Sequence, residues 1–161
     1  MDRFLLTEHR ASMMPTLQSS AEKRTLAQWS AQFLVASELV RRGYLVAFTM
    51  GNSTPDADLV VGKPRQQPFW IDVKGNATRG AWLIKPKLSA PSLYYVLVSL
   101  SPLASSDGTR KPDEFFVLSQ SDVAELTSRY LQSHPRDRNK VPGFGFKDPH
   151  KFRNAWDKLP L

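Results

Sequence analysis

Apolar residues recur at helical spacing in the segment between Ser19 and Gly43. Positions 26, 29, 33, 36 and 40 are all apolar and lie three or four residues apart, with no Pro or Gly between them. Ser19 and Glu22 have the spacing of a capping box, which begins a helix. Gly43 supplies a stop signal at the other end. The pattern predicts one long helix that ends at Gly43.

Short apolar runs replace the helical repeat after Gly43. Such runs, bounded by turn-forming residues, are typical of strands. They predict strands at 44–49, 58–61, 69–74, 82–84, 94–100 and 115–118. Because a loop from Gly62 to Pro68 joins 58–61 to 69–74, we expect these two to form an antiparallel hairpin. The run 94–100 is largely apolar, which is typical of a central strand.

Helical spacing returns after position 120. Ser121 and Asp122 are good first residues for a second helix, in which Val123, Leu126 and Tyr130 share one face. Residues 134–146 read as a loop. Asp148 and Pro149 then predict the start of a short final helix that carries Phe152 and Trp156.

These elements predict an α/β domain with a mixed central sheet flanked by helices. The 161 residues suit a single domain spanning 19–161, with residues 1–18 as an irregular arm. No apolar run approaches the ~18–20 residues that span a bilayer, and the first residues lack the apolar stretch of a secretory signal. We therefore expect a soluble, cytoplasmic protein with no membrane partner.

The amino-acid composition limits which metal ligands and which binding partners the protein can have. The chain has no cysteine, which excludes disulfides and thiolate metal sites. Its net charge is +7, a balance that favours a polyanionic partner such as nucleic acid. Arg79, Lys85 and Lys87 are candidates for phosphate contacts, and a solvated basic face is the competing interpretation.

Two acids and a lysine carry the most specific signal. Asp58 opens the run Leu59-Val60-Val61, and Asp72-Val73-Lys74 ends the next apolar run. Residues two apart in a strand share a face, so Asp72 and Lys74 point the same way. Two carboxylates on adjacent strands can hold Mg²⁺ through oxygen ligands, and a neighbouring ammonium can hold the attacking water and offset charge on the phosphate. A solvated strand face is the alternative for an isolated Asp-x-Lys triplet.

The order of these elements resembles the PD-(D/E)XK nuclease superfamily, in particular its small resolvase-like and restriction-endonuclease-like members. Residues 55–61 and 71–74 match the two acidic parts of the motif, and residues 33–44 resemble the helix that leads into the sheet. The resemblance covers roughly residues 22–100. It implies a restriction-endonuclease-like core of order αβββαβ and a Mg²⁺- or Mn²⁺-dependent endonuclease that hydrolyses phosphodiester bonds in DNA. It also implies a possible homodimer.

The resemblance assigns roles to individual residues. It implies that Asp58 and Asp72 are the metal ligands, with Lys74 assisting the attacking water; Asp56 is the other candidate for the first acid. The family's helix acid corresponds to Gln32, whose carbonyl oxygen can coordinate a metal but brings no negative charge. Glu38 is the nearest acid on the helix, and a solvent-facing role beside two arginines is equally compatible with its position.

Two other functions remain open at this point. Gln32 raises the alternative of a DNA-binding module of the same fold that has lost efficient cleavage. The basic charge is also compatible with an interaction subunit of a defence or mobile-element system that binds an acidic partner.

Overall fold

The computed structural model describes residues 19–49, 57–84, 87, 92–102, 109–135 and 142–160. The predicted arm at 1–18 lies outside the described residues. Among the described residues, a helix comes first, six strands and a second helix follow, and a short strand and two 3₁₀ turns come last. The structure is therefore an α/β fold with a mixed sheet, as the sequence predicts.

The first helix, α1, spans Ser20–Arg41 and confirms the predicted long helix. Ser19 and Glu22 form the reciprocal capping box. At the other end Gly43 adopts a φ of 83°, a left-handed conformation that glycine accepts without the clash of a Cβ. The chain can therefore leave the helix in a tight turn and enter the sheet directly.

The buried face of α1 shares only Ala36 with the apolar stripe that the sequence displays. Leu26, Phe33 and Val40 are 50%, 60% and 58% exposed. The face that packs on the sheet carries instead a mixture of small, aliphatic and amide side chains: Ala31, Gln32, Val35, Ala36 and Leu39. The polar residue Gln32 is thus buried, whereas large apolar residues of the same helix are exposed to solvent.

The main sheet has five strands in the order β1-β2-β3-β5-β6. Their bounds are β1 Leu45–Phe48, β2 Leu59–Gly62, β3 Phe69–Asn76, β5 Leu93–Ser99 and β6 Glu114–Ser119. β2 and β3 form the predicted antiparallel hairpin, whereas β3 and β5 are parallel. β3 therefore lies in the middle of the sheet, and it continues two residues beyond the predicted end at Lys74.

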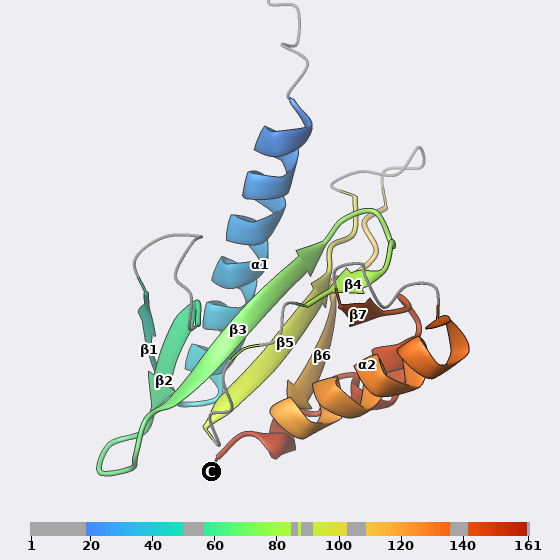
Figure 1. Ribbon diagram of the computed structural model, residues 1–161. Coiled ribbons are helices and arrows are strands. Elements are labelled where there is room, and N and C mark those ends of the chain that lie inside the picture. The colour runs from blue at the N-terminus through green and yellow to red at the C-terminus, as the bar shows by residue number, and fades with distance from the viewer. Residues whose placement is uncertain are drawn as a thin grey trace, which may run out of the picture.

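The sheet separates two hydrophobic cores, because successive strand residues point to opposite faces. One core lies under α1 and contains Ile71, Val73 and Trp156. The other lies under the second helix, α2 (Gln120–Ser133), and contains Tyr95 and Leu126. Figure 1 shows the two helices on opposite sides of the twisted sheet, with α2 over β5 and β6.

Two short strands form a second sheet beside α2. β4 (Trp82–Leu83) pairs antiparallel with β7 (Gly143–Phe144). The prediction of a loop over 134–146 was therefore wrong at β7. The final helix is also shorter than predicted, since it consists of two 3₁₀ turns, η2 (Asp148–Phe152) and η3 (Trp156–Lys158).

The crossover from β3 to the parallel strand β5 differs from the expected order αβββαβ. Its described residues contain β4, and no helix is present among them. α2 comes only after β6, where Ser119 and Asp122 form its capping box. In the part of the chain that the structure describes, no helix is long and apolar enough to cross a membrane.

Candidate functional site

Asp58 is fixed where β2 begins by the last contacts of the β2–β3 hairpin. Leu59 pairs with Ile71, and one residue earlier the Asp58 backbone N–H donates to Ile71 O at 3.0 Å. The Val73 N–H then donates to Asp58 Oδ2 at 2.7 Å. The carboxylate takes the place that a main-chain carbonyl would hold in the ladder, so its direction is set by the sheet itself.

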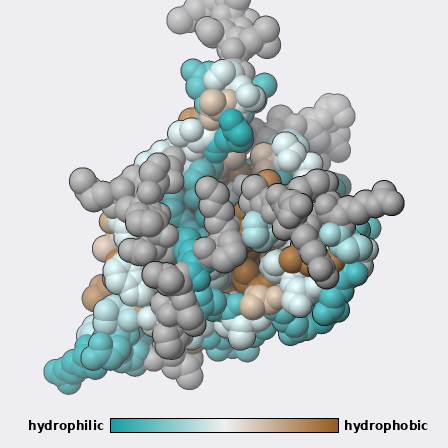
Figure 2. All heavy atoms as spheres, in the orientation of Figure 1, coloured by the Kyte–Doolittle hydropathy of each residue, from teal (hydrophilic) through white to brown (hydrophobic). Residues whose placement is uncertain are grey.

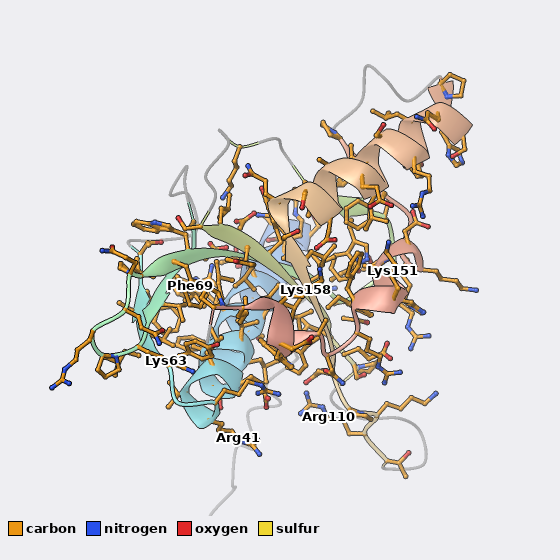
Figure 3. All side chains as sticks on the ribbon, turned by 90° about the horizontal axis from the view of Figure 1, so that it is seen from below. Arg41, Lys63, Phe69, Arg110, Lys151 and Lys158 are labelled. Atoms are coloured by element: carbon orange, nitrogen blue, oxygen red, sulfur yellow. The ribbon has the colours of Figure 1, made fainter. Side chains whose placement is uncertain are left out.

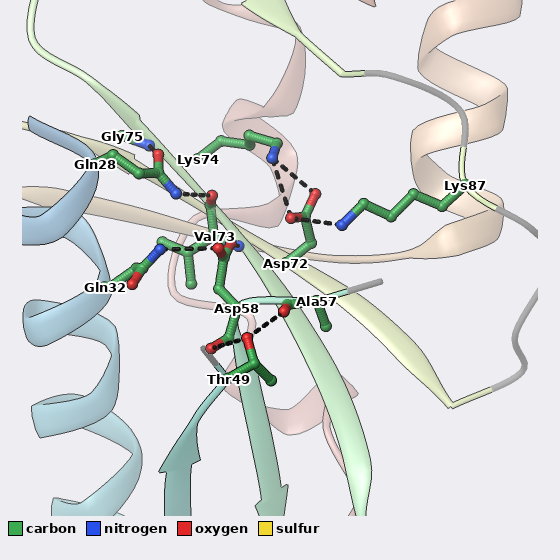
Figure 4. Close-up of polar contacts among 10 residues, drawn as sticks. All are labelled: Gln28, Gln32, Thr49, Ala57, Asp58, Asp72, Val73, Lys74, Gly75 and Lys87. Atoms are coloured by element: carbon green, nitrogen blue, oxygen red, sulfur yellow. Dashed lines mark hydrogen bonds and ion pairs between the residues drawn. The ribbon is translucent and has the colours of Figure 1, made fainter. Parts of the chain in front are cut away.

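Two glutamines of α1 reach the same place from the helix. Gln32 Nε2 donates to Asp58 Oδ1 at 2.8 Å, and both side chains are buried. One turn earlier, Gln28 Nε2 donates to Val73 O at 2.8 Å and Gln28 Oε1 accepts from Gly75 N at 3.4 Å. Figure 4 shows the two amides side by side, one on the carboxylate and one on the backbone of β3.

The close approach of α1 to β3 depends on Gly75. A Cβ at this position would lie 2.6 Å from Ala27 O and 2.9 Å from Ala31 Cβ, both closer than real contacts allow. The absent side chain therefore lets the helix backbone come near enough for Gln28 and Gln32 to make direct hydrogen bonds.

Asp72 lies on the face of β3 that points away from α1, and it is 2% exposed. Lys74 Nζ is 3.0 Å from each of its carboxylate oxygens, and Lys87 Nζ is 2.9 Å from Oδ1. Among the described residues, Oδ2 accepts no hydrogen bond of good geometry although it is buried. Two ammonium groups thus converge on one buried carboxylate, and one of its oxygens is incompletely satisfied.

Burial perturbs the ionisable groups around Asp72. Burial is the main cause that raises the pKa of Asp58 to about 6; the Val73 N–H and Lys74 oppose it, while the neighbouring Asp72 carboxyl, through its charge and a shared hydrogen bond, adds to it. Burial, followed by the negative charge of Asp72, also raises the pKa of Tyr95 to about 12. Asp58 and Asp72 are therefore close enough to influence each other electrostatically.

The structure brings together four of the residues singled out in the sequence: Gln32, Asp58, Asp72 and Lys74 (Figure 4). Lys87, expected to contact nucleic acid, lies against Asp72. Asp72 is more deeply buried than a residue on a half-exposed strand face would be.

The remaining candidates do not join this cluster. Glu38 forms ion pairs with Arg41 and Arg42 on its own helix, which favours the solvent-facing role. Arg79 is exposed and has a φ of 56°. Asp56 and Lys85 lie outside the described residues. Within the described ranges, no three His, Cys, Asp or Glu side chains gather as a metal-binding group.

Sequence reasoning missed two residues of this site. Gln28 lies four residues before Gln32, and this helical spacing of two amides was a signal that they share a face. Tyr95 pairs in register with Asp72 across the parallel β3–β5 ladder. That register depends on the crossover between the strands, so no local pattern in the sequence indicated it.

Comparison of this chain with protein-family models, with curated proteins and with solved structures finds no match. The functional argument therefore depends on the geometry of the site and on the motif in the sequence.

Proposed function

We propose that this protein is a metal-dependent DNA endonuclease that hydrolyses phosphodiester bonds, built on a restriction-endonuclease-like core. The observation that supports the proposal best is the meeting of Asp58, Asp72 and Lys74 where β2 begins alongside β3. Two buried carboxylates, with a lysine on the strand that carries Asp72, provide oxygen ligands and a positive charge beside them, a combination that can support phosphate hydrolysis.

The donor set fits a hard divalent cation, Mg²⁺ or Mn²⁺. Asp58 and Asp72 would hold it through carboxylate oxygens, which suit hard cations better than soft ones. Asp72 Oδ2 is buried, and the Lys74 ammonium 3.0 Å away makes no well-directed hydrogen bond to it among the described residues, so this oxygen can still accept a further ligand. When bound, the cation would polarise a phosphate oxygen and lower the pKa of a bound water.

The protein groups have separate roles in this proposal. Asp72 holds the Lys74 ammonium in place, where it can orient a water molecule and offset negative charge on the phosphate. Gln32 and the Val73 N–H fix the direction of the Asp58 carboxylate. Such fixed groups lower the cost of reorganisation during the reaction, which is how preorganised sites gain rate.

The net charge of +7 supports DNA as the polyanionic partner. Figure 3 places Arg41, Lys63, Arg110 and Lys151 at separate points around the molecule, so these four residues do not form one binding face. Trp70 is 38% exposed two residues before Asp72, on the same face of β3, and provides an aromatic surface beside the site. Phosphate contacts by Arg79 and Lys85, and a homodimer, remain predictions.

A second function, DNA binding without cleavage, is favoured by one observation. The Gln32 amide donates to Asp58 where the family has an acid, so Gln32 adds no negative charge. A site with two carboxylates attracts a divalent cation less strongly than a site with three.

A plasmid-nicking assay separates the two functions. With Mg²⁺ or Mn²⁺, we expect the wild-type protein to convert supercoiled plasmid to nicked circles, and chelation with EDTA to stop the reaction. Lys74→Ala should slow nicking by about 100-fold, the scale of removing one charge-stabilising group. Lys111→Ala, which removes an equal charge from an exposed position, should nick normally. Plasmid binding without any metal-dependent nicking would instead favour the non-cleaving module.

A further inference from the structure

Asp72 forms ion pairs with two ammonium groups that come from different parts of the chain. Lys74 belongs to the same strand, two residues along, and its position follows from the geometry of β3. Lys87 lies in the crossover between β4 and β5, outside both sheets. Figure 4 shows the two lysines approaching the carboxylate from different directions. Lys74 thus belongs to a strand of the sheet, whereas Lys87 belongs to a connecting segment.

Lys87 is well embedded for a lysine. Its side chain is 16% exposed, against 30% for Lys74, and its Nζ lies 2.9 Å from Asp72 Oδ1. Lysine side chains are seldom this buried unless their charge is paired. The charge of Lys87 is therefore balanced at the carboxylate that the proposed function assigns to the metal.

The local balance of charge has a consequence for metal binding. Among the described residues, the cluster holds two carboxylates, Asp58 and Asp72, and two ammonium groups, so its formal charge is zero when both carboxyls are ionised. A divalent cation on Asp72 would lie within a few ångströms of both ammonium groups and would be repelled by them, strongly so in a buried site. The cation can bind well only if one ammonium group leaves, and Lys87 is the one that is not part of the strand.

We propose that Lys87 is a tethered competitor of the divalent cation: it neutralises Asp72 in the free protein and transfers to a backbone phosphate when DNA binds. This inference rests on the proposed function, because it assigns Asp72 to metal binding. DNA and metal then bind cooperatively, since each relieves the cost of displacing Lys87, and such coupling between two ligands is reciprocal. Lys87 is accordingly a positioning residue that links substrate binding to metal loading.

Metal binding to the free full-length protein provides the first test. Mn²⁺ is titrated into the protein, and the unbound ion is counted by electron paramagnetic resonance. We expect Lys87→Met to bind Mn²⁺ about tenfold more tightly than wild type, within the usual range of coupling between sites. Lys87→Arg keeps the charge and should bind as wild type does. Lys111→Met, which removes an equal charge from an exposed position, should also leave the affinity unchanged.

The second test measures the coupling. The affinity for a short fluorescent duplex is measured by anisotropy with and without Ca²⁺, an oxygen-seeking cation. In the wild type we expect Ca²⁺ to tighten duplex binding at least about fivefold. In Lys87→Met this tightening should be at least about threefold smaller, because no ammonium group has to be displaced and only the direct contact between the cation and a phosphate still couples the two ligands. Circular dichroism checks that each variant is folded; if Lys87→Met is not, Lys87→Gln replaces it in both experiments.

The outcomes distinguish this inference from the proposed function. Equal Mn²⁺ affinity of folded Lys87→Met and wild type, with metal-dependent nicking intact, would overturn the role of Lys87 alone. Absence of Mn²⁺ binding in every variant, with or without duplex, would overturn both, and the lysines would then be structural ion-pair partners of Asp72.

Discussion

The two carboxylates of the site are neighbours, yet they are held by opposite kinds of group. On the α1 side, Asp58 accepts hydrogen bonds from the neutral Gln32 amide and the Val73 N–H. On the other face of β3, Asp72 is held by the ammonium groups of Lys74 and Lys87. Neutral donors offset less of the cost of burying a charge than ammonium groups do, because an ammonium group also brings an opposite charge.

This difference in surroundings gives the two aspartates different chemical properties within one site. Burial raises the pKa of Asp58 to about 6, so a proton leaves it near neutral pH. Asp72 forms instead a fixed ion pair that holds Lys74 in place. Carboxyl groups in contrasting environments commonly divide the work of a site between them. Each prediction below changes one half of the site and leaves the other intact.

The largest effect is expected from Asp72→Asn. The amide keeps the shape of the side chain but removes the charge that holds Lys74 and, in the proposed function, the cation. Metal-dependent plasmid nicking should fall by at least about 100-fold. Asp157→Asn, which removes an exposed carboxylate, should nick at the wild-type rate. Nicking by Asp72→Asn within a few-fold of the wild type would contradict the assignment of Asp72.

The next effect concerns stability and pH at Asp58. Its pKa is about 6 in the folded protein against about 3.8 in the unfolded chain, so the folded state binds this proton more tightly. The stabilisation that results is complete below about pH 3.8 and is lost as the pH rises through about 6. Asp58→Asn has no such proton to lose.

Asp58→Asn should therefore gain stability relative to wild type between pH 4 and pH 8. The upper limit of the gain is about 3 kcal/mol, from the size of the pKa shift. Urea unfolding of both proteins across this range measures the difference, and titrating groups that do not interact with Asp58 cancel because the two proteins share them. A difference in unfolding free energy that stays constant with pH would show that Asp58 titrates normally.

The sequence indicated the half of the site that depends on short-range geometry. An antiparallel hairpin brings Asp58 beside β3 whatever the rest of the fold, and strand alternation puts Asp72 and Lys74 on one face. These contacts follow from residues within about 16 positions of one another in the sequence. The motif could therefore be located before its surroundings were known.

The other half depends on contacts between distant elements, which local patterns do not encode. Phe33 belongs to the apolar stripe of α1, yet it is 60% exposed. The helix packs where a small residue such as Ala31 fits against Gly75. Lys87 reaches Asp72 through the crossover of the parallel pair β3–β5. Figure 2 shows apolar atoms still at the surface, where hydrophobicity alone would have predicted burial.

Gly75→Ala tests the close packing of α1 on β3. The added Cβ would meet Ala27 O at 2.6 Å, so the helix backbone must move away and carry Gln32 with it. We expect a loss of about 2 kcal/mol in the free energy of unfolding, which is typical of overpacking. Gly80→Ala is the control, since its new Cβ would find no atom nearer than 3.5 Å. Equal stability of the two variants in urea would contradict the tight contact.

Gln32→Glu should have a smaller effect, and it bears directly on the contrast between the two carboxylates. The new carboxylate would lie beside Asp58, because Gln32 is within hydrogen-bond distance of it. Like charges in a buried site repel, so the metal-free protein should lose stability at neutral pH and recover it on acidification. A divalent cation removes that repulsion, and Mn²⁺ affinity should therefore rise about tenfold, the equivalent of about 1.4 kcal/mol.

Gln32→Met separates the two consequences of the Gln32→Glu change. It also removes the amide that donates to Asp58 but adds no charge, so it should lose stability without gaining Mn²⁺ affinity. If Gln32→Glu binds Mn²⁺ no better than Gln32→Met, position 32 does not face the cation, and the amide only orients Asp58. If its affinity rises while that of Gln32→Met does not, the missing charge at position 32 weakens metal binding in the natural sequence.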